Sequence, residues 1–221
     1  MESILSQHKA VWYDRFFRIS VIIGIFLLIS SLFINYTAGT YASSQQSEAV
    51  SDIILDFLPA VNVESIFIEG SYIFIAFVLC IMFFRPHYIP FTIKSIALFV
   101  LIRSGFISLT HIGPSPHVIT LDPSFIFQKI NFTGDLFFSG HTGLPFLLAL
   151  IFWEHKKIRM LFLFAAVLFG VTVLLGHLHY SIDVFAAFFI TYTIFTIAKK
   201  FFAKDWVYAN KPKSSQDQAY P

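Results

Sequence analysis

Six stretches of the chain are continuously apolar and long enough to cross a membrane. A bilayer core about 30 Å thick requires roughly 20 mostly apolar helical residues per crossing. Strands of a membrane barrel would instead alternate apolar and polar side chains over about ten residues. The uninterrupted runs therefore predict helical spans over residues 16–34, 66–84, 91–109, 136–153, 158–176 and 180–202.

The predicted fold is all-α: a polytopic membrane protein whose residues 1–203 form a bundle of six transmembrane helices. The connection over residues 35–65 is rich in Ser, Gln and Thr. Within it, residues 52–58 carry apolar side chains at helical spacing, which predicts a short helix on the membrane surface, either a connector or a lid over a site. Residues 204–221 are polar and contain two prolines, so we predict a disordered tail.

Composition supports a membrane protein. Of the 221 residues, 57% are hydrophobic and only 13% are charged, and 29 are Phe. A soluble domain is about 45–50% apolar and about 25% charged, so a water-soluble or disordered chain is excluded. The single cysteine, Cys80, excludes an intramolecular disulfide and a cysteine-based metal site. A net charge of +2 without a long Lys/Arg run gives no support for nucleic-acid binding.

The distribution of Lys and Arg predicts the topology. With six spans, 13 of the 15 basic residues fall on one side of the membrane, whereas the loops on the other side hold Lys129 and eight acidic residues. Cytoplasmic segments carry the excess of Lys and Arg, so we predict that both termini, including the tail, are cytoplasmic. The first apolar run is slightly longer than the core of a usual signal peptide, and we expect it to be retained.

Ionisable side chains gather at the predicted extracytoplasmic boundary. Arg103 lies near that end of the third span, residues 139–142 (SGHT) open the fourth, and residues 177–183 (HLHYSID) open the sixth. Such residues are costly in hydrocarbon and are functional candidates by default. The topology places all three groups at the depth of the lipid headgroups.

The spacing of His179 and Asp183 is suited to catalysis. Four residues apart on a helix, the two side chains share a face, so the carboxylate can reach an imidazole nitrogen. A carboxylate that holds one nitrogen fixes the tautomer and leaves the other nitrogen as a nucleophile or a base.

The start of the fourth span is suited to an anion. Ser139 and Gly140, with Pro145 as a first-turn residue, predict a helix start whose free backbone N–H groups bind phosphate. Arg103 adds a planar, permanently charged partner for a phosphoryl group. Together with the two histidines and the carboxylate, these residues indicate phosphoryl transfer.

Two segments resemble the signature motifs of sphingomyelin synthases: residues 134–142 (GDLFFSGHT) and residues 176–184 (GHLHYSIDV). Arg103-Ser104, followed by residues 113–116 (GPSP), resembles an earlier motif of that family. These enzymes are six-span members of the type-2 phosphatidic acid phosphatase superfamily. The resemblance covers about residues 85–200.

The resemblance implies roles for the matching residues. His179 would be the nucleophile that forms a phosphohistidine, with Asp183 orienting it. His141 would be the general acid for the leaving alcohol and then the base for the acceptor. No metal or other cofactor would be required. The implied phosphate-binding residues are Arg103, Ser139 and Gly140.

The implied activity moves a phospho-headgroup from a glycerophospholipid, such as phosphatidylcholine, to a lipid alcohol, ceramide or diacylglycerol. The water-using phosphatases of the superfamily carry a Lys-x6-Arg-Pro motif, whereas this chain has Val78 before Arg85-Pro86. They also carry Arg six residues before the nucleophilic histidine, where this chain has Val173. Both departures favour the synthase-like branch. A lipid phosphatase that uses water remains an alternative, as does a non-catalytic lipid transporter.

Three neighbouring residues, Asp135, His177 and Tyr180, are candidates for supporting the site. Asp135 either caps the fourth span or orients a headgroup. His177 points elsewhere on a helix than His179, so it either supports the site or faces water. A zinc site built from the histidines is disfavoured because Arg103 nearby would repel the metal. The sequence leaves the oligomeric state open.

Overall fold

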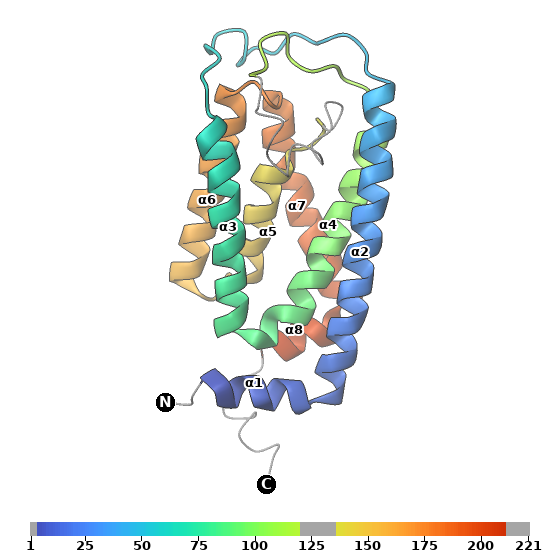
Figure 1. The fold of residues 1–221 in the computed structure, drawn as a ribbon, viewed down its shortest axis with the longest axis vertical. Coiled ribbons are helices and arrows are strands. Elements are labelled where there is room, and N and C mark those ends of the chain that lie inside the picture. Colours follow the sequence, from blue (N-terminus) through green and yellow to red (C-terminus); the bar gives the residue numbers. More distant parts are fainter. Residues whose placement is uncertain (1–3, 120–135, 211–221) are drawn as a thin grey trace.

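The structure is a computed structural model of the chain, and it describes residues 4–119 and 136–210. Within these residues it is helical and contains no strand (Figure 1). The elements in chain order are α1 (Ile4–Tyr13), α2 (Arg15–Ser44), α3 (Glu64–Phe84), the short 3₁₀ helix η1 (Pro86–Tyr88), α4 (Ile89–Leu109), α5 (Gly140–Ile151), α6 (Lys156–Leu175), α7 (Ser181–Phe201) and α8 (Ala203–Ala209).

Five helices of the described residues are long and apolar enough to cross a membrane: α2, α3, η1 with α4, α6 and α7. They contain 20 to 30 residues each and coincide with five of the six predicted spans. The largest difference is in α2, which continues to Ser44 rather than ending at residue 34. The all-α prediction is therefore confirmed for the described residues, and a multi-pass membrane protein is supported.

The predicted fourth span, 136–153, differs from the structure. It contains α5, a helix of 12 residues, about 18 Å long and shorter than a bilayer core. Ser139 caps its start, and its Oγ accepts a hydrogen bond from Thr142 N at 3.4 Å. Pro145 is the sixth helical residue rather than a first-turn residue. Figure 1 shows the start of α5 set below the upper ends of α3 and α6.

Helix α5 is apolar because it lies in the core of the bundle. Most of its side chains are buried, and it packs against α4, α6 and α7. A Cβ at Gly143 would lie 2.8 Å from the Phe99 ring of α4 and 2.8 Å from Thr191 Oγ1 of α7. Only glycine allows so close an approach at this point. Sequence reasoning could not separate this helix from a full span, because buried and lipid-facing residues are equally apolar.

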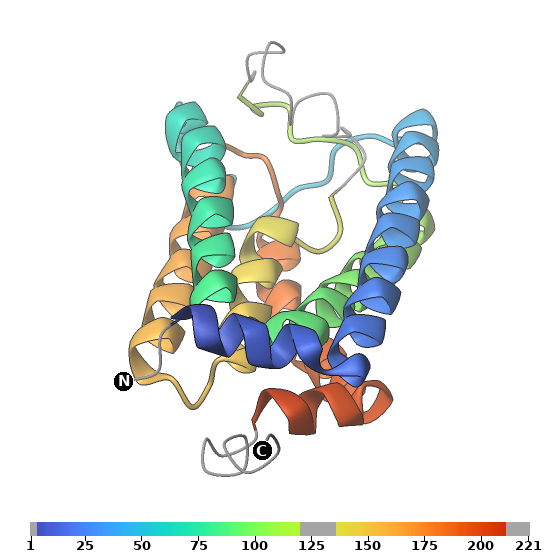
Figure 2. The same cartoon turned by 60° about the horizontal axis from the view of Figure 1, so that its bottom comes forward.

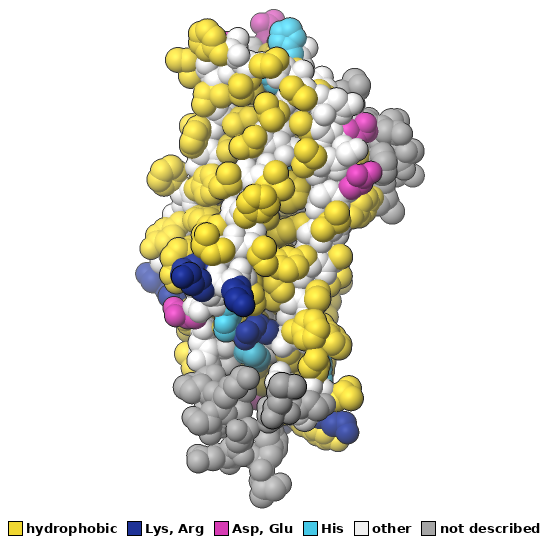
Figure 3. Space-filling view, turned by 90° about the vertical axis from the view of Figure 1, so that its left-hand side faces the viewer, with side chains coloured by type: hydrophobic (Ala, Val, Ile, Leu, Met, Phe, Trp, Pro, Cys, Tyr) yellow, Lys and Arg dark blue, Asp and Glu magenta, His cyan; other side chains and the backbone are white. Residues whose placement is uncertain are grey.

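The two ends of the bundle differ. Residues 45–63 and 110–119 lie at one end, which we call the loop end (Figure 1). Helices α1 and α8 cross the opposite end, the terminal end (Figure 2). On the face shown in Figure 3, an apolar band covers most of the bundle, and Lys and Arg side chains gather below it toward the terminal end.

The connection between α2 and α3 forms a short run of hydrogen-bonded turns over residues 53–57 rather than the predicted surface helix. Asp56 N donates to Asp52 O at 2.8 Å, and Leu58 N donates to Ile54 O at 3.1 Å. Leu55 is buried, whereas Ile53 and Phe57 are 79% and 85% exposed. The segment therefore lies on the loop end with the side chains of Asp52 and Leu55 directed inward.

The predicted disordered tail begins instead with a helix. Asp205 of α8 is buried and forms an ion pair with Lys94 Nζ of α4 at 2.7 Å. Lys94 also donates to Ser20 Oγ of α2 at 2.5 Å. A polar residue near the end of the chain is thus held by a buried partner, which local sequence does not show. Residues 211–221 lie outside the described residues.

Candidate active site

The segment before α5 runs beside the first turn of α7. Ser139 N donates to Asp183 O at 3.0 Å, and Leu136 O accepts a hydrogen bond from His179 Nδ1 at 2.8 Å. Leu136, Ser139 and His179 are all buried. These backbone contacts bring the starts of two helices together, although about 40 residues separate them in sequence.

The surroundings of His179 fix its tautomer. Its Nδ1 lies 2.8 Å from Leu136 O and 3.4 Å from Asp183 Oδ2. Both neighbours are acceptors, so the hydrogen of the neutral imidazole resides on Nδ1. The lone pair is then on Nε2, where a nucleophile needs it. The Leu136 carbonyl makes the shorter contact, and sequence reasoning did not identify it.

The carboxylate of Asp183 makes two contacts within the site. It is fully buried, and its Oδ2 accepts a hydrogen bond from Tyr180 N at 2.9 Å while lying 3.4 Å from the His179 ring. The same carboxylate therefore closes the first turn of α7 and faces the imidazole. Its Oδ1 has no hydrogen-bond partner in the part of the chain that the structure describes.

Arg103 of α4 approaches the start of α5. Its Nε donates to Phe138 O at 2.9 Å. A Cβ placed on Gly140 would lie 3.4 Å from Nε and 3.6 Å from Cζ of Arg103, so the guanidinium rests against the first helical residue. Backbone N–H groups of a first helical turn lack partners within the helix, and the helix dipole favours an anion there. The guanidinium and the helix start together suit a phosphoryl group.

His141 is the second residue of α5 and is partly exposed. Its ring packs against Phe67 of α3, with centroids 4.2 Å apart, and lies 6.0 Å from the Phe169 ring of α6. The imidazole therefore faces α3 and α6, whereas Arg103 reaches the same helix start from α4. The structure brings His141 into the first turn of α5, beside Gly140.

The remaining candidates lie on the outside of this site. His177 Nε2 donates to Leu58 O at 3.1 Å, and the hydroxyl of Tyr180 donates to Gly113 O at 2.9 Å. Both side chains therefore point to the loops rather than to the start of α5. Asp135 lies outside the described residues. Across residues 4–119 and 136–210, no three His, Cys, Asp or Glu side chains are grouped as metal ligands.

Sequence reasoning missed Asp52 as a residue of this region. Its Oδ2 accepts a hydrogen bond from Ser181 N, the first residue of α7, at 2.7 Å. The two residues are 129 positions apart, and a lone Asp in a polar connection gives no local signal of such a contact.

A comparison with known protein families matches one segment of the chain. Residues 133–200 match the family described as PAP2 superfamily C-terminal, a segment that includes α5, α6 and most of α7. No curated protein and no solved structure matches the chain. The family match supports membership of the type-2 phosphatidic acid phosphatase superfamily and, broadly, a lipid phosphatase or phosphotransferase activity.

Proposed function

We propose that the chain is a membrane phosphotransferase that moves a phospho-headgroup from a glycerophospholipid to a lipid alcohol through a phosphohistidine on His179. The family match supports the broader reaction class. The resemblance to sphingomyelin synthases suggests the donor, for example phosphatidylcholine, and the acceptor, ceramide or diacylglycerol. The observation that carries the proposal is the fixed tautomer of His179, whose Nδ1 faces two hydrogen-bond acceptors, Leu136 O and Asp183 Oδ2.

In the first step, His179 Nε2 attacks the phosphorus of the donor. The bond between phosphorus and the diacylglycerol oxygen breaks while the bond between nitrogen and phosphorus forms. His141 gives a proton to the leaving alcohol. Arg103 and the start of α5 hold the phosphoryl oxygens, whose charge grows in the transition state. Leu136 O and Asp183 stabilise the positive charge that develops on the imidazole.

In the second step, the acceptor hydroxyl loses its proton to His141 and attacks the same phosphorus. The nitrogen–phosphorus bond breaks, and His179 regains its lone pair. Water in place of the lipid alcohol would give the hydrolase reaction. The partly exposed ring of His141 suits a group that meets two different alcohols in turn.

We also propose that the site faces the extracytoplasmic side. This orientation rests on the Lys and Arg distribution, because basic residues favour cytoplasmic segments. It requires a sixth crossing, which we assign to α5 together with the residues on either side of it. Since α5 is enclosed by other helices, its short length does not expose backbone groups to lipid.

Purified protein in mixed micelles with headgroup-labelled phospholipids tests the proposal. Reactions with and without ceramide or diacylglycerol are compared by mass spectrometry, with His179→Ala as the inactive variant and His117→Ala, a loop histidine, as its matched control. We expect a new phospholipid that depends on the acceptor and is absent from His179→Ala alone. Acceptor-independent release of phosphate or phospho-headgroup would establish a hydrolase instead, and no turnover of any lipid would favour the transporter.

A further inference from the structure

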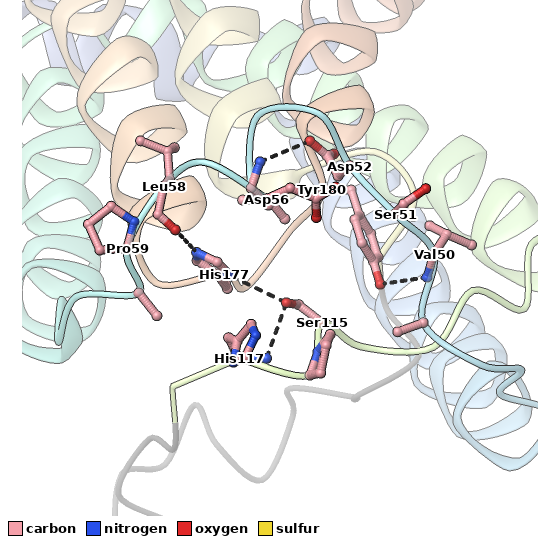
Figure 4. A pocket seen from close by; sticks show the side chains of 14 residues that line it. Val50, Ser51, Asp52, Asp56, Leu58, Pro59, Ser115, His117, His177 and Tyr180 are labelled. Carbon is pink, nitrogen blue, oxygen red and sulfur yellow. Dashed lines mark hydrogen bonds between the residues drawn. The ribbon is translucent and has the colours of Figure 1, made fainter.

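The turn that carries His179 is held from outside by both connections of the loop end. The turn, residues 176–180, joins α6 to α7, whose first residue is Ser181. His179 points from it toward the start of α5. Hydrogen bonds to the loops are made by Gly176, His177 and Tyr180 of the turn and by Ser181. Figure 4 shows bonds of His177 and Tyr180. We call residues 47–61 the first loop and residues 110–119 the second loop.

The first loop reaches the turn at several points. Asp52 Oδ2 accepts from Ser181 N at 2.7 Å, and Val61 N donates to Leu175 O, immediately before the turn, at 2.8 Å. His177 Nε2 donates to Leu58 O at 3.1 Å. Of these contacts, the bond to Ser181 is the one made by a charged side chain, and charged partners form the stronger hydrogen bonds.

The second loop reaches the same turn from the other side. The Tyr180 hydroxyl donates to Gly113 O at 2.9 Å, and Ser115 Oγ lies 3.3 Å from His177 Nδ1. Ile119 N donates to Gly176 O at 3.1 Å. Tyr180 joins both loops, because its hydroxyl oxygen also accepts from the backbone N–H of the first loop at residue 50, at 3.3 Å.

The two loops are joined to each other as well. Ser47 N donates to His111 O at 2.7 Å, and Gly113 N donates to Glu48 O at 3.3 Å. A Cβ on Gly113 would lie 2.2 Å from Ser47 O, so only glycine allows this contact. The loops and the turn therefore form one hydrogen-bonded unit.

The backbone of the turn requires this support. His177 has a φ of 52°, in the left-handed region that costs energy for residues other than glycine. Both nitrogens of its buried ring are bound by the loops, at Leu58 and Ser115. His179 follows two residues later, so a change in this backbone would move the imidazole.

Polar contacts hold the first loop at this place together with apolar packing, because Leu55 is buried in a cluster with Leu136 and Tyr180. A cavity of about 620 Å³ lies between the two loops and the turn, and its lining includes Asp52, Asp56, His117, His177 and Tyr180 (Figure 4). Asp52 borders this cavity, where its hydrogen bond with Ser181 N links the first loop to α7.

The surroundings of Asp52 favour the charged form of its carboxylate. Burial alone would raise the pKa of its carboxyl, but hydrogen bonds from the backbone N–H groups of Ser181, Leu55 and Ile54 hold this pKa below its ordinary value. The carboxylate is therefore ionised at neutral pH. It lies at the first residue of α7, where the helix dipole favours a negative charge.

We propose that Asp52 is a positioning residue for the nucleophile: it fixes the first turn of α7 and thereby the place of His179. This inference rests on the proposed function, in which His179 attacks phosphorus. Asp52 does not touch the reacting atoms and acts through Ser181. A displacement of a reacting group by about 1 Å can lower the rate about 10²-fold, so removal of this contact should be seen in turnover.

The test compares Asp52→Ala and Asp52→Asn with Asp56→Ala in the full-length protein. Asp56 belongs to the same loop, but no bond from its carboxylate to α7 is seen, so it is the matched control. We expect Asp52→Ala to lower kcat about 10- to 100-fold with KM within about twofold. Asp52→Asn retains an acceptor oxygen and should recover part of the rate. Asp56→Ala should behave as the unmodified protein.

Amide hydrogen exchange supplies a readout that does not need catalysis. In Asp52→Ala, amides of residues 177–183 should exchange faster, while those of α8 stay unchanged. Tyr180→Phe, which removes the contacts to both loops, should give the same pattern if Asp52→Ala folds poorly. Faster exchange with an unchanged kcat, or unchanged exchange, would overturn the positioning role. If exchange is faster in Asp52→Ala but the unmodified protein turns over no lipid, the structural role of Asp52 is retained and the proposed function is rejected.

Discussion

Replacing His179 with alanine is expected to abolish lipid turnover, with a loss in kcat of about 10⁴-fold or more. Both proposed steps pass through a bond between His179 Nε2 and phosphorus, so no other group of the site can replace it. The variant should fold, because the ring is held by two polar contacts and fills little of the apolar core. The measurement is the steady-state release of labelled product at saturating donor lipid.

Asp183→Asn tests whether Asp183 acts on His179 by orienting the ring or by its negative charge. Leu136 O lies closer to His179 Nδ1 than Asp183 does, at 2.8 Å against 3.4 Å, so the correct tautomer should survive the substitution. We therefore expect a smaller loss than for His179→Ala, arising from the missing negative charge beside the imidazolium. Equal losses for the two variants would contradict the role given to the Leu136 carbonyl.

Replacing Lys94 with alanine should cause the largest loss of stability, about 3–5 kcal/mol. The substitution leaves Asp205 buried at 4% exposure without its cationic partner, and among the described residues Ser20 is the side chain that still bonds to its carboxylate. Because this pair lies at the terminal end, the activity of each folded molecule should stay close to normal. Thermal unfolding in detergent, followed by circular dichroism, measures the effect.

Two further variants test whether the unpaired charge of Asp205 causes the loss of stability. Lys204→Ala removes an exposed cation one residue from Asp205 and should change stability by less than about 0.5 kcal/mol. Lys94→Met combined with Asp205→Leu removes both buried charges and should recover most of the stability. A double variant as unstable as Lys94→Ala would show that packing, and not the unpaired charge, causes the loss.

Local patterns in the sequence predicted the parts of the fold that are locally determined. Long apolar runs correspond to five helices of spanning length, because each such helix must present apolar side chains to lipid. The proximity of His179 and Asp183 was also expected from their spacing, but the reason differs: His179 lies in the turn before α7 rather than on the helix, so the contact forms across the helix start. The arrival of α5 beside α7 was expected from topology, and the structure shows these helix starts in contact.

Contacts between distant segments could not be predicted in this way. Lys94 and Asp205 are 111 residues apart, and Asp52 and Ser181 are 129 apart. In both cases the carboxylate lies in a polar segment that composition alone assigns to a loop or a tail. Its burial depends on a partner that only the folded chain supplies. The sequence therefore predicted a solvent-exposed carboxylate where the structure has a buried one with a bonding partner.

Direct detection of a phosphorylated histidine tests the proposed chemistry most closely. The protein is incubated briefly with headgroup-labelled phospholipid without acceptor, quenched in alkali because phosphohistidine is labile to acid, digested, and mapped by mass spectrometry. We expect the phospho-headgroup on His179, its loss on addition of the lipid alcohol, and none in His179→Ala. Turnover that continues with no adduct on His179, or with the adduct on another residue, would contradict the mechanism.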